Sequence, residues 1–276
     1  YSLVPTIRGG IEGYPMDDPT LDPFMELVNG LALQLPTKSP DSTRVAWGPD
    51  TGFVYVMEAS GEPSVLFRLT TDGIVSGRIA SAPGDRFFFG SEEGQVYAIE
   101  ATRNGRVLWS QPFGEPFYNG PMVVGDRLLL RSTYGSLYCL DTGDGHSVWN
   151  RPAGNVDELI GTIGNQVYIR NLSGALSVID LDTGERIGTF GEVQPVSILT
   201  NTATDRIYML SESGAVQCLK PIGADLPTPT ETPPPPPAVE EKPDSPAEKP
   251  AGSPFDPNAG GDPFAPAAGA DPFGAG

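Results

Sequence analysis

A short glycine-led segment recurs five times along the chain, and this repeat limits the folds open to it more than any other feature. In each copy an aliphatic residue stands two positions after the glycine, and an aliphatic residue or methionine stands five positions after it. The glycines are separated by 42, 41, 39 and 40 residues. They are Gly52, Gly94, Gly135, Gly174 and Gly214. Self-similarity at a fixed period of this size indicates a chain built from stacked copies of one supersecondary unit.

The residues around each glycine indicate β-strands. A short apolar run such as Arg86–Phe89 precedes the glycine, and a second run such as Val96–Ile99 follows it. A tight hairpin turn needs positive φ, which glycine adopts at little steric cost. Upstream runs such as Pro121–Val124 supply one more strand, and a further run downstream supplies another. The sequence therefore predicts an all-β fold made of four-stranded units.

The last strand expected in each unit leads to an aromatic residue, 14 to 16 positions after the glycine. These residues are Phe67, Trp109, Trp149 and Phe190. The fifth unit runs into Pro221 before it reaches such a strand. Because an open sheet edge needs covering, two alternatives remain for it. Either Ser2–Ile7 supplies the closing strand, or further units precede Tyr1.

Four short strands for every forty residues or so are typical of a β-propeller blade. The pattern Gly-x-Val-Tyr-Ala-Ile-Glu, followed by Gly-x-x-x-Trp, resembles the repeat of the PQQ-like (pyrroloquinoline-quinone enzyme) propeller family. Its best copies are Gly94–Trp109 and Gly135–Trp149, and the resemblance covers Gly30–Lys220. It implies about five blades of the four-stranded kind also found in WD40 propellers. The family includes quinoprotein dehydrogenases, BamB-type outer-membrane-assembly proteins and sensor regions of bacterial kinases.

Composition divides the chain into three predicted regions. Residues 1–29 form an N-terminal segment that could close the propeller, and residues 30–223 form the propeller. Residues 224–276 carry nine acids and two bases, and 16 of the 30 prolines lie from Pro221 onward. A chain of this composition cannot bury enough apolar surface to offset its entropy, so we expect a disordered tail. Its Asp-Pro-Phe copies, at 262–264 and 271–273, are interpreted as weak interaction points at most.

The charge of the chain excludes some classes of partner. Its formal net charge is -18, from 35 acidic and 17 basic residues. A nucleic-acid binder needs lysine and arginine to neutralise phosphates, so nucleic acid is excluded as a partner. Apolar runs stay short, as in Leu128–Leu130, so no transmembrane segment is expected. The chain begins at Tyr1 without a visible signal peptide, and we expect it to be processed or an internal piece.

The residue types that carry chemistry show no constellation for catalysis, cofactor binding or metal binding. His146, the single histidine, stands in a predicted turn, where solvation is its ordinary state. Cys139 and Cys218 share one repeat position, which predicts small buried residues that do not pair with each other. Tyr55 and its equivalents at 97 and 138 are interpreted as packing between blades. Adjacent acids such as those at 92 and 93 fit polar turns.

These observations lead to one functional expectation and two alternatives. We expect a non-enzymatic, exported β-propeller without a cofactor, which binds or scaffolds other proteins in the bacterial cell envelope or periplasm. The identity of the protein partner is left open. The family resemblance also implies a fragment of a quinone- and calcium-dependent dehydrogenase, or the sensor propeller of a larger receptor kinase. The adjacent cysteines of the dehydrogenases have no counterpart in this sequence.

Overall fold

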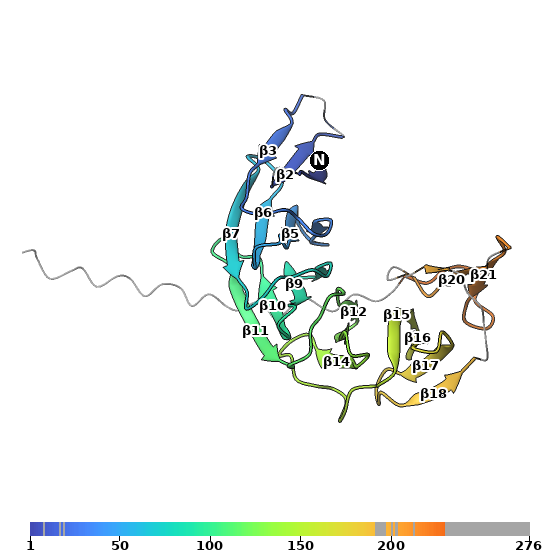
Figure 1. The fold of residues 1–276 in the computed structure, drawn as a ribbon. Helices are drawn as coiled ribbons and strands as arrows, with labels where there is room; N and C mark the ends of the chain where they lie inside the picture. The colour runs from blue at the N-terminus through green and yellow to red at the C-terminus, as the bar shows by residue number, and fades with distance from the viewer. Residues whose placement is uncertain are drawn as a thin grey trace, which may run out of the picture. The chain divides into compact units, whose positions relative to one another are not determined.

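The computed structural model describes residues 1–7, 9–16, 18, 20–190, 197–199, 201, 204–211 and 213–229. In this part of the chain, 21 strands form six small antiparallel sheets (Figure 1). The all-β prediction is therefore confirmed. No helix among these residues has the length and hydropathy of a membrane span. The predicted tail lies outside the described residues from position 230 onward, so its disorder stays a prediction.

Three of the sheets have four strands and three have three, counted over the described residues. The first sheet consists of β1 (Ser2–Pro5), β2 (Ile11–Tyr14) and β3 (Phe24–Glu26). The second consists of β4 (Thr37–Lys38), β5 (Arg44–Trp47), β6 (Phe53–Glu58) and β7 (Ser64–Thr70). The third consists of β8 (Ala80–Ala82), β9 (Arg86–Gly90), β10 (Gln95–Glu100) and β11 (Arg106–Pro112).

The remaining sheets follow in chain order, and strands within each sheet pair with their sequence neighbours. The fourth sheet consists of β12 (Met122–Val124), β13 (Arg127–Arg131) and β14 (Leu137–Asp141). The fifth consists of β15 (Val156–Ile163), β16 (Gln166–Asn171), β17 (Leu176–Asp180) and β18 (Arg186–Thr189). The sixth consists of β19 (Ser197–Leu199), β20 (Ile207–Leu210) and β21 (Val216–Leu219).

The repeat glycines stand between the second and third strands of the second to sixth sheets. All five adopt positive φ, with values of 71°, 90°, 81°, 85° and 80° in chain order. A left-handed residue lets a two-strand hairpin turn tightly, and a side chain at such a position is strained. The regular glycine spacing thus marks one hairpin in each of these sheets.

The sequence indicates about five repeat units, whereas the described residues form six sheets. The additional sheet is the first one, which has no glycine-led hexapeptide. One alternative for the open last unit placed Ser2–Ile7 beside it, but Ser2–Pro5 pairs with Ile11–Tyr14 in this first sheet. The physical reason is proximity along the chain, because a short turn brings β1 and β2 together.

Five hydrophobic clusters hold the sheets together, and each cluster joins two successive sheets. The third sheet shows how this works. Phe87 and Phe89 pack toward the second sheet, whereas Phe88 packs toward the fourth, and all three side chains are fully buried. Burying one such side chain stabilises the fold by roughly 1.5 to 3 kcal/mol. Inner sheets are therefore apolar on both faces, which explains why their strands show no simple alternation.

Candidate functional site

Aromatic side chains link successive sheets at the outer strand. Phe67 packs on Gly105, so that a Cβ on this glycine would lie 2.5 Å from the Phe67 ring. Trp109 packs in the same way on Gly145 and Trp149 on Gly184, at 2.5 and 2.6 Å. In each case the aromatic side chain extends from one sheet and packs on the outer turn of the next sheet. Three of the four repeat aromatics, Phe67, Trp109 and Trp149, thus connect neighbouring units.

Both tryptophans also donate a hydrogen bond to the turn that they cover. Nε1 of Trp109 donates to the carbonyl of Thr142 over 3.1 Å, and Nε1 of Trp149 donates to that of Leu181 over 2.8 Å. The rings are 8% and 3% exposed. A buried indole N–H needs a partner to avoid a desolvation penalty. Each tryptophan therefore fixes the next turn by packing and by a directed bond.

Phe190 does not have this arrangement, although its spacing matches that of the other aromatics. Ala98 on β10 lies opposite Trp109, but the equivalent residue Val178 on β17 lies opposite Gly188. The nitrogen of Phe190 donates instead to the carbonyl of Leu176, farther along the ladder. Its side chain is 47% exposed. Phe190 therefore lies two residues beyond Gly188, the residue that occupies the position of Trp109 in the ladder.

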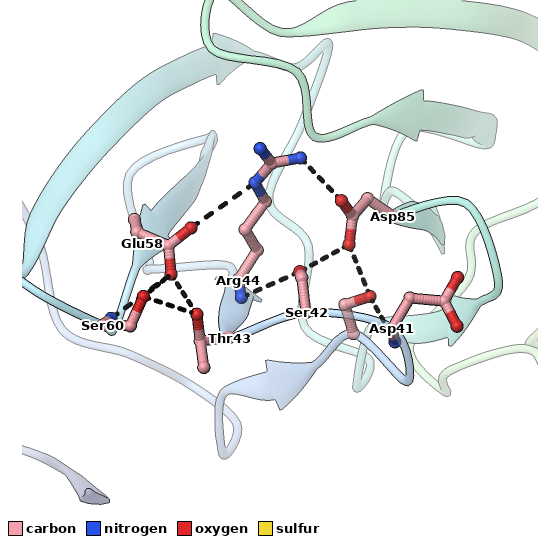
Figure 2. A network of polar contacts seen from close by, with 8 residues as sticks. Asp41, Ser42, Thr43, Arg44, Glu58, Ser60 and Asp85 are labelled. Atoms are coloured by element: carbon pink, nitrogen blue, oxygen red, sulfur yellow. Dashed lines mark hydrogen bonds and ion pairs between the residues drawn. The ribbon is translucent and has the colours of Figure 1, made fainter.

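A polar network connects the second sheet to the turn that leads into β9 (Figure 2). Arg44 Nη1 contacts Asp85 Oδ2 over 2.6 Å, and Arg44 Nε lies 3.7 Å from Glu58 Oε2. The hydroxyls of Ser39 and Ser42 both donate to Asp85 Oδ1, over 2.7 and 2.5 Å. The Asp85 carboxylate thus accepts three hydrogen bonds from residues far earlier in the chain. This network thus connects the second sheet to the third.

Replacing Asp85 with asparagine should lower the free energy of unfolding by about 1 to 2 kcal/mol, because charge-assisted hydrogen bonds are lost. Asp85 has φ of 53°, a conformation that asparagine tolerates, so the backbone should not change. The matched control is Asp126→Asn. Asp126 also contacts an arginine, at 3.0 Å, but its side chain is 63% exposed. Urea denaturation should show a loss below about 1 kcal/mol for the control, and equal losses would contradict the argument.

One cluster of potential metal ligands lies on the surface of the fourth sheet. Ligand atoms of Asp141, Asp144 and His146 all lie within 4.8 Å of one another. His146 Nδ1 lies 2.5 Å from Asp144 Oδ1, and this hydrogen bond raises the pKa of His146. The backbone nitrogens of Gly143 and His146 donate to the same carboxylates. These bonds are those of an ordinary acidic turn, and they account for the geometry of the cluster.

The three repeat tyrosines contribute to aromatic packing. Tyr55 stacks on Trp47 with ring centroids 5.6 Å apart, and Tyr97 stacks on Phe89 at 5.3 Å. Tyr138 meets Phe113 edge to face at 4.8 Å. Burial raises the pKa of Tyr97 and Tyr138. The first two contacts lie within one sheet, and the third, between a residue after β11 and a residue of β14, joins two sheets as expected for packing between blades.

The two cysteines differ in environment, and the prediction that both are buried is wrong for Cys218. Cys139 is fully buried, and burial raises the pKa of its thiol to about 12. Cys218 is exposed, and no disulfide joins the two residues. Cys139 lies between two packed sheets, whereas no sheet of the described residues covers the outward face of β21. Burial at this repeat position therefore depends on the neighbouring sheet.

A thiol-reactive reagent should distinguish the two cysteines. We expect one fast equivalent per native chain, from Cys218, and a second only on unfolding, because the Cys139 thiol is buried and protonated at neutral pH. Ellman's reagent gives the stoichiometry, and Cys218→Ser should abolish the fast phase. Two fast equivalents in the native protein would contradict the arrangement.

The family model described as "Outer membrane protein assembly factor BamB" matches residues 43–190, which is more than half of the chain. The chain belongs to the BamB-like PQQ propeller family. The matched residues run from the start of β5 to Phe190 and contain every aromatic–glycine contact described above. The resemblance drawn from the glycine repeat is therefore confirmed.

Solved structures of other proteins match the chain, and the two with a TM-score of 0.50 or more share its fold. BamB from Moraxella catarrhalis is 15% identical, with a TM-score of 0.48 over 66% of this chain and 62% of that one. The computationally designed Ika8 protein is 12% identical, with a TM-score of 0.59 over 79% and 67%. Sqt1 from Saccharomyces cerevisiae is 12% identical, with a TM-score of 0.50 over 67% and 58%. No curated protein sequence matches the chain.

The repeat pattern predicts residues at regular positions, and it does not indicate an exposed apolar surface on the sixth sheet. Leu199, Tyr208, Leu210, Val216 and Cys218 share the face of this sheet that points away from the fifth. Leu199 is 51% exposed and Val216 is 65% exposed. The parity of the two strand pairings could have placed these residues together, but only the sheet order shows that the described residues leave the face uncovered.

Proposed function

We propose that this chain is a non-enzymatic, exported β-propeller that binds or scaffolds other proteins in the bacterial cell envelope. Membership of the BamB-like family over residues 43–190 carries the proposal, because that family is described by an outer-membrane assembly factor. The matched solved BamB extends beyond this chain, which spans 62% of its length. An envelope location is part of the proposal and follows from the same family description.

The way in which this chain uses its side chains supports a binding function. Trp109 and Trp149 connect sheets by packing on turn glycines, and the Arg44–Asp85 network connects a sheet to a turn. Rigid sheets present the connecting turns and the face of the sixth sheet to solvent. These turns carry exposed apolar side chains, and Tyr134 and Leu172 are 69% and 63% exposed. Turns held by a rigid scaffold are common binding elements.

Site-specific photocrosslinking in the native host tests the proposal. A photoreactive phenylalanine analogue replaces Tyr134 or Leu172 in turns, and Trp109 serves as the buried control. We expect discrete cross-linked protein products from the turn positions, recovered in the envelope fraction, and none from the control. Recovery of the protein in the cytoplasmic fraction without cross-linked products would refute the proposal.

The dehydrogenase alternative has its own test. Pyrroloquinoline quinone and calcium are added to the purified chain, and absorbance spectra and melting temperature are recorded. For a non-enzymatic binding protein, we expect no spectral change and no rise in melting temperature. A rise that depends on both additions would favour the alternative, since a ligand that binds only the folded state stabilises it.

A further inference from the structure

The outer edge of β21 differs from the equivalent edge in every sheet that carries the family repeat. In the second, third and fifth sheets, β7, β11 and β18 pair with the third strand. In the fourth sheet, Ser147 and Ala153 form bridges to β14 at the same edge. Among the described residues, no strand or bridge lies beyond β21. Its main chain is therefore a template for strand addition.

Apolar side chains of β21 are exposed at positions where the equivalent residues of other sheets are buried. Val216 is 65% exposed, while the equivalent residues Val54 and Val96 are fully buried. Cys218 is exposed, while the equivalent Cys139 is fully buried. The sequence of β21 is as apolar as that of β6 or β10. The composition of β21 is thus that of a covered strand, but no strand among the described residues covers it.

The registers of the second and third sheets indicate which residues a fourth strand contributes, whereas in the fifth sheet Val178 lies opposite Gly188 and Ile179 opposite Arg186. On β6, Val56 lies opposite Phe67 and Met57 lies opposite Val65. On β10, Ala98 lies opposite Trp109 and Ile99 opposite Val107. Both pairings contain the same one-residue register shift at this point. The equivalent residues of β21 are Cys218 and Leu219, so an aromatic residue belongs opposite Cys218 and a β-branched residue opposite Leu219.

The residue that follows β21 also restricts which strand could pair with it. Six positions after the repeat glycine, the second to fifth sheets carry an acid, whereas the sixth carries Lys220. In the third sheet the acid, Glu100, lies opposite Arg106 and binds it over 2.6 Å. The acids are Glu58, Glu100, Asp141 and Asp180. Lys220 Nζ lies 3.8 Å from the exposed carboxylate of Asp225. A strand that completes the sixth sheet should begin with an acid, which would take the place of this exposed partner opposite Lys220.

We propose that the outer edge of β21 binds an extended segment of a partner protein as a fourth strand, with the order acid, β-branched residue, any residue, aromatic residue. The inference rests on the proposed binding function and specifies the partner class for one surface. Main-chain hydrogen bonds along the edge supply affinity, and the three side-chain positions supply specificity.

The test uses a peptide copied from this chain. A fluorescent peptide has the sequence of β11, Arg106–Pro112, with the Arg106→Glu change, and its anisotropy is measured with the full-length chain. We expect saturable binding, with affinity about threefold to tenfold weaker for the unmodified arginine peptide, because an exposed charge pair is worth up to about 1 kcal/mol and its reversal adds a repulsion. A Lys220→Glu protein should reverse this preference while its unfolding curve stays unchanged.

Two peptide controls separate strand addition from general apolar binding. Phe113 donates to the carbonyl of Gly94, and donors alternate along an antiparallel ladder, so Gln111 is the next donor. A Gln111→Pro peptide should lose binding although its apolar content remains. A Trp109→Ala peptide should bind at least tenfold more weakly, since it lacks the aromatic ring. Bound peptide should also slow the reaction of Cys218 with maleimide.

Several results would overturn the inference. They are absence of binding at millimolar peptide, equal binding of the glutamate and arginine peptides, unchanged preference with Lys220→Glu, and full binding of the proline peptide. A protein that sediments as a dimer and binds no peptide would show that a second copy occupies the edge. If photocrosslinking at the turns succeeds while the peptide fails, the proposed function stands and only this assignment falls.

Discussion

Replacing Trp149 with alanine should lower the free energy of unfolding by about 3 to 5 kcal/mol, as expected when a large buried aromatic side chain is removed. The ring is 3% exposed and belongs to the cluster that joins the fourth and fifth sheets. Its loss would leave a cavity over Gly184 and deprive the carbonyl of Leu181 of its donor. Urea denaturation followed by circular dichroism measures the change.

Phe190→Ala is the matched control, because the sequence places both residues at the same repeat position. With 47% of its side chain exposed, Phe190 should contribute less than about 1 kcal/mol. A Trp149→Phe variant keeps most of the packing and should lose only about 1 to 3 kcal/mol through the unsatisfied carbonyl. A Trp149→Ala loss no greater than that of Phe190→Ala would show that the aromatic–glycine contact does not stabilise the fold.

Gly184→Ala should also be strongly destabilising, by about 2 to 4 kcal/mol, when strain from positive φ and overpacking are added. Its φ is 75°, and the new Cβ would lie 2.6 Å from Cδ2 of Trp149. Gly174→Ala is the matched control in the same sheet. Gly174 has φ of 85° but no atom within 4 Å of a built Cβ, so only the backbone strain of about 1 to 2 kcal/mol applies.

A double-mutant cycle isolates the steric part of this prediction. In the Trp149→Ala background the ring is gone, so Gly184→Ala should cost about the same as Gly174→Ala. The measured interaction energy between positions 149 and 184 then equals the overpacking, about 1 to 3 kcal/mol. Additive effects of the two changes would mean that the Trp149 ring does not lie over the glycine.

The sequence predicted those parts of the fold that depend on local rules. A glycine needs only its own hairpin to adopt positive φ, and all five repeat glycines do so. Burial on both strand faces was likewise predictable from runs such as Phe87–Phe89, because an apolar run with no alternation needs cover on both sides.

Features that depend on distant partners were not predictable in this way. Whether Phe190 covers a turn depends on the register of β18, which spacing alone does not give. Exposure of Cys218 depends on whether a sheet follows the sixth one. The contact between Arg44 and Asp85 depends on how a turn of the third sheet meets the second. The first sheet was not predicted from the sequence because its strands carry no repeat hexapeptide.

Among the described residues, each hydrophobic cluster joins only neighbouring sheets, and this has a consequence for cooperativity. A linear array with nearest-neighbour coupling unfolds from its ends, because a terminal member loses one interface where an inner member loses two. Hydrogen exchange should therefore be faster in β20 than in β9. A strand bound to β21 would act as an end cap, and its stabilising effect would fall off from one sheet to the next along the chain.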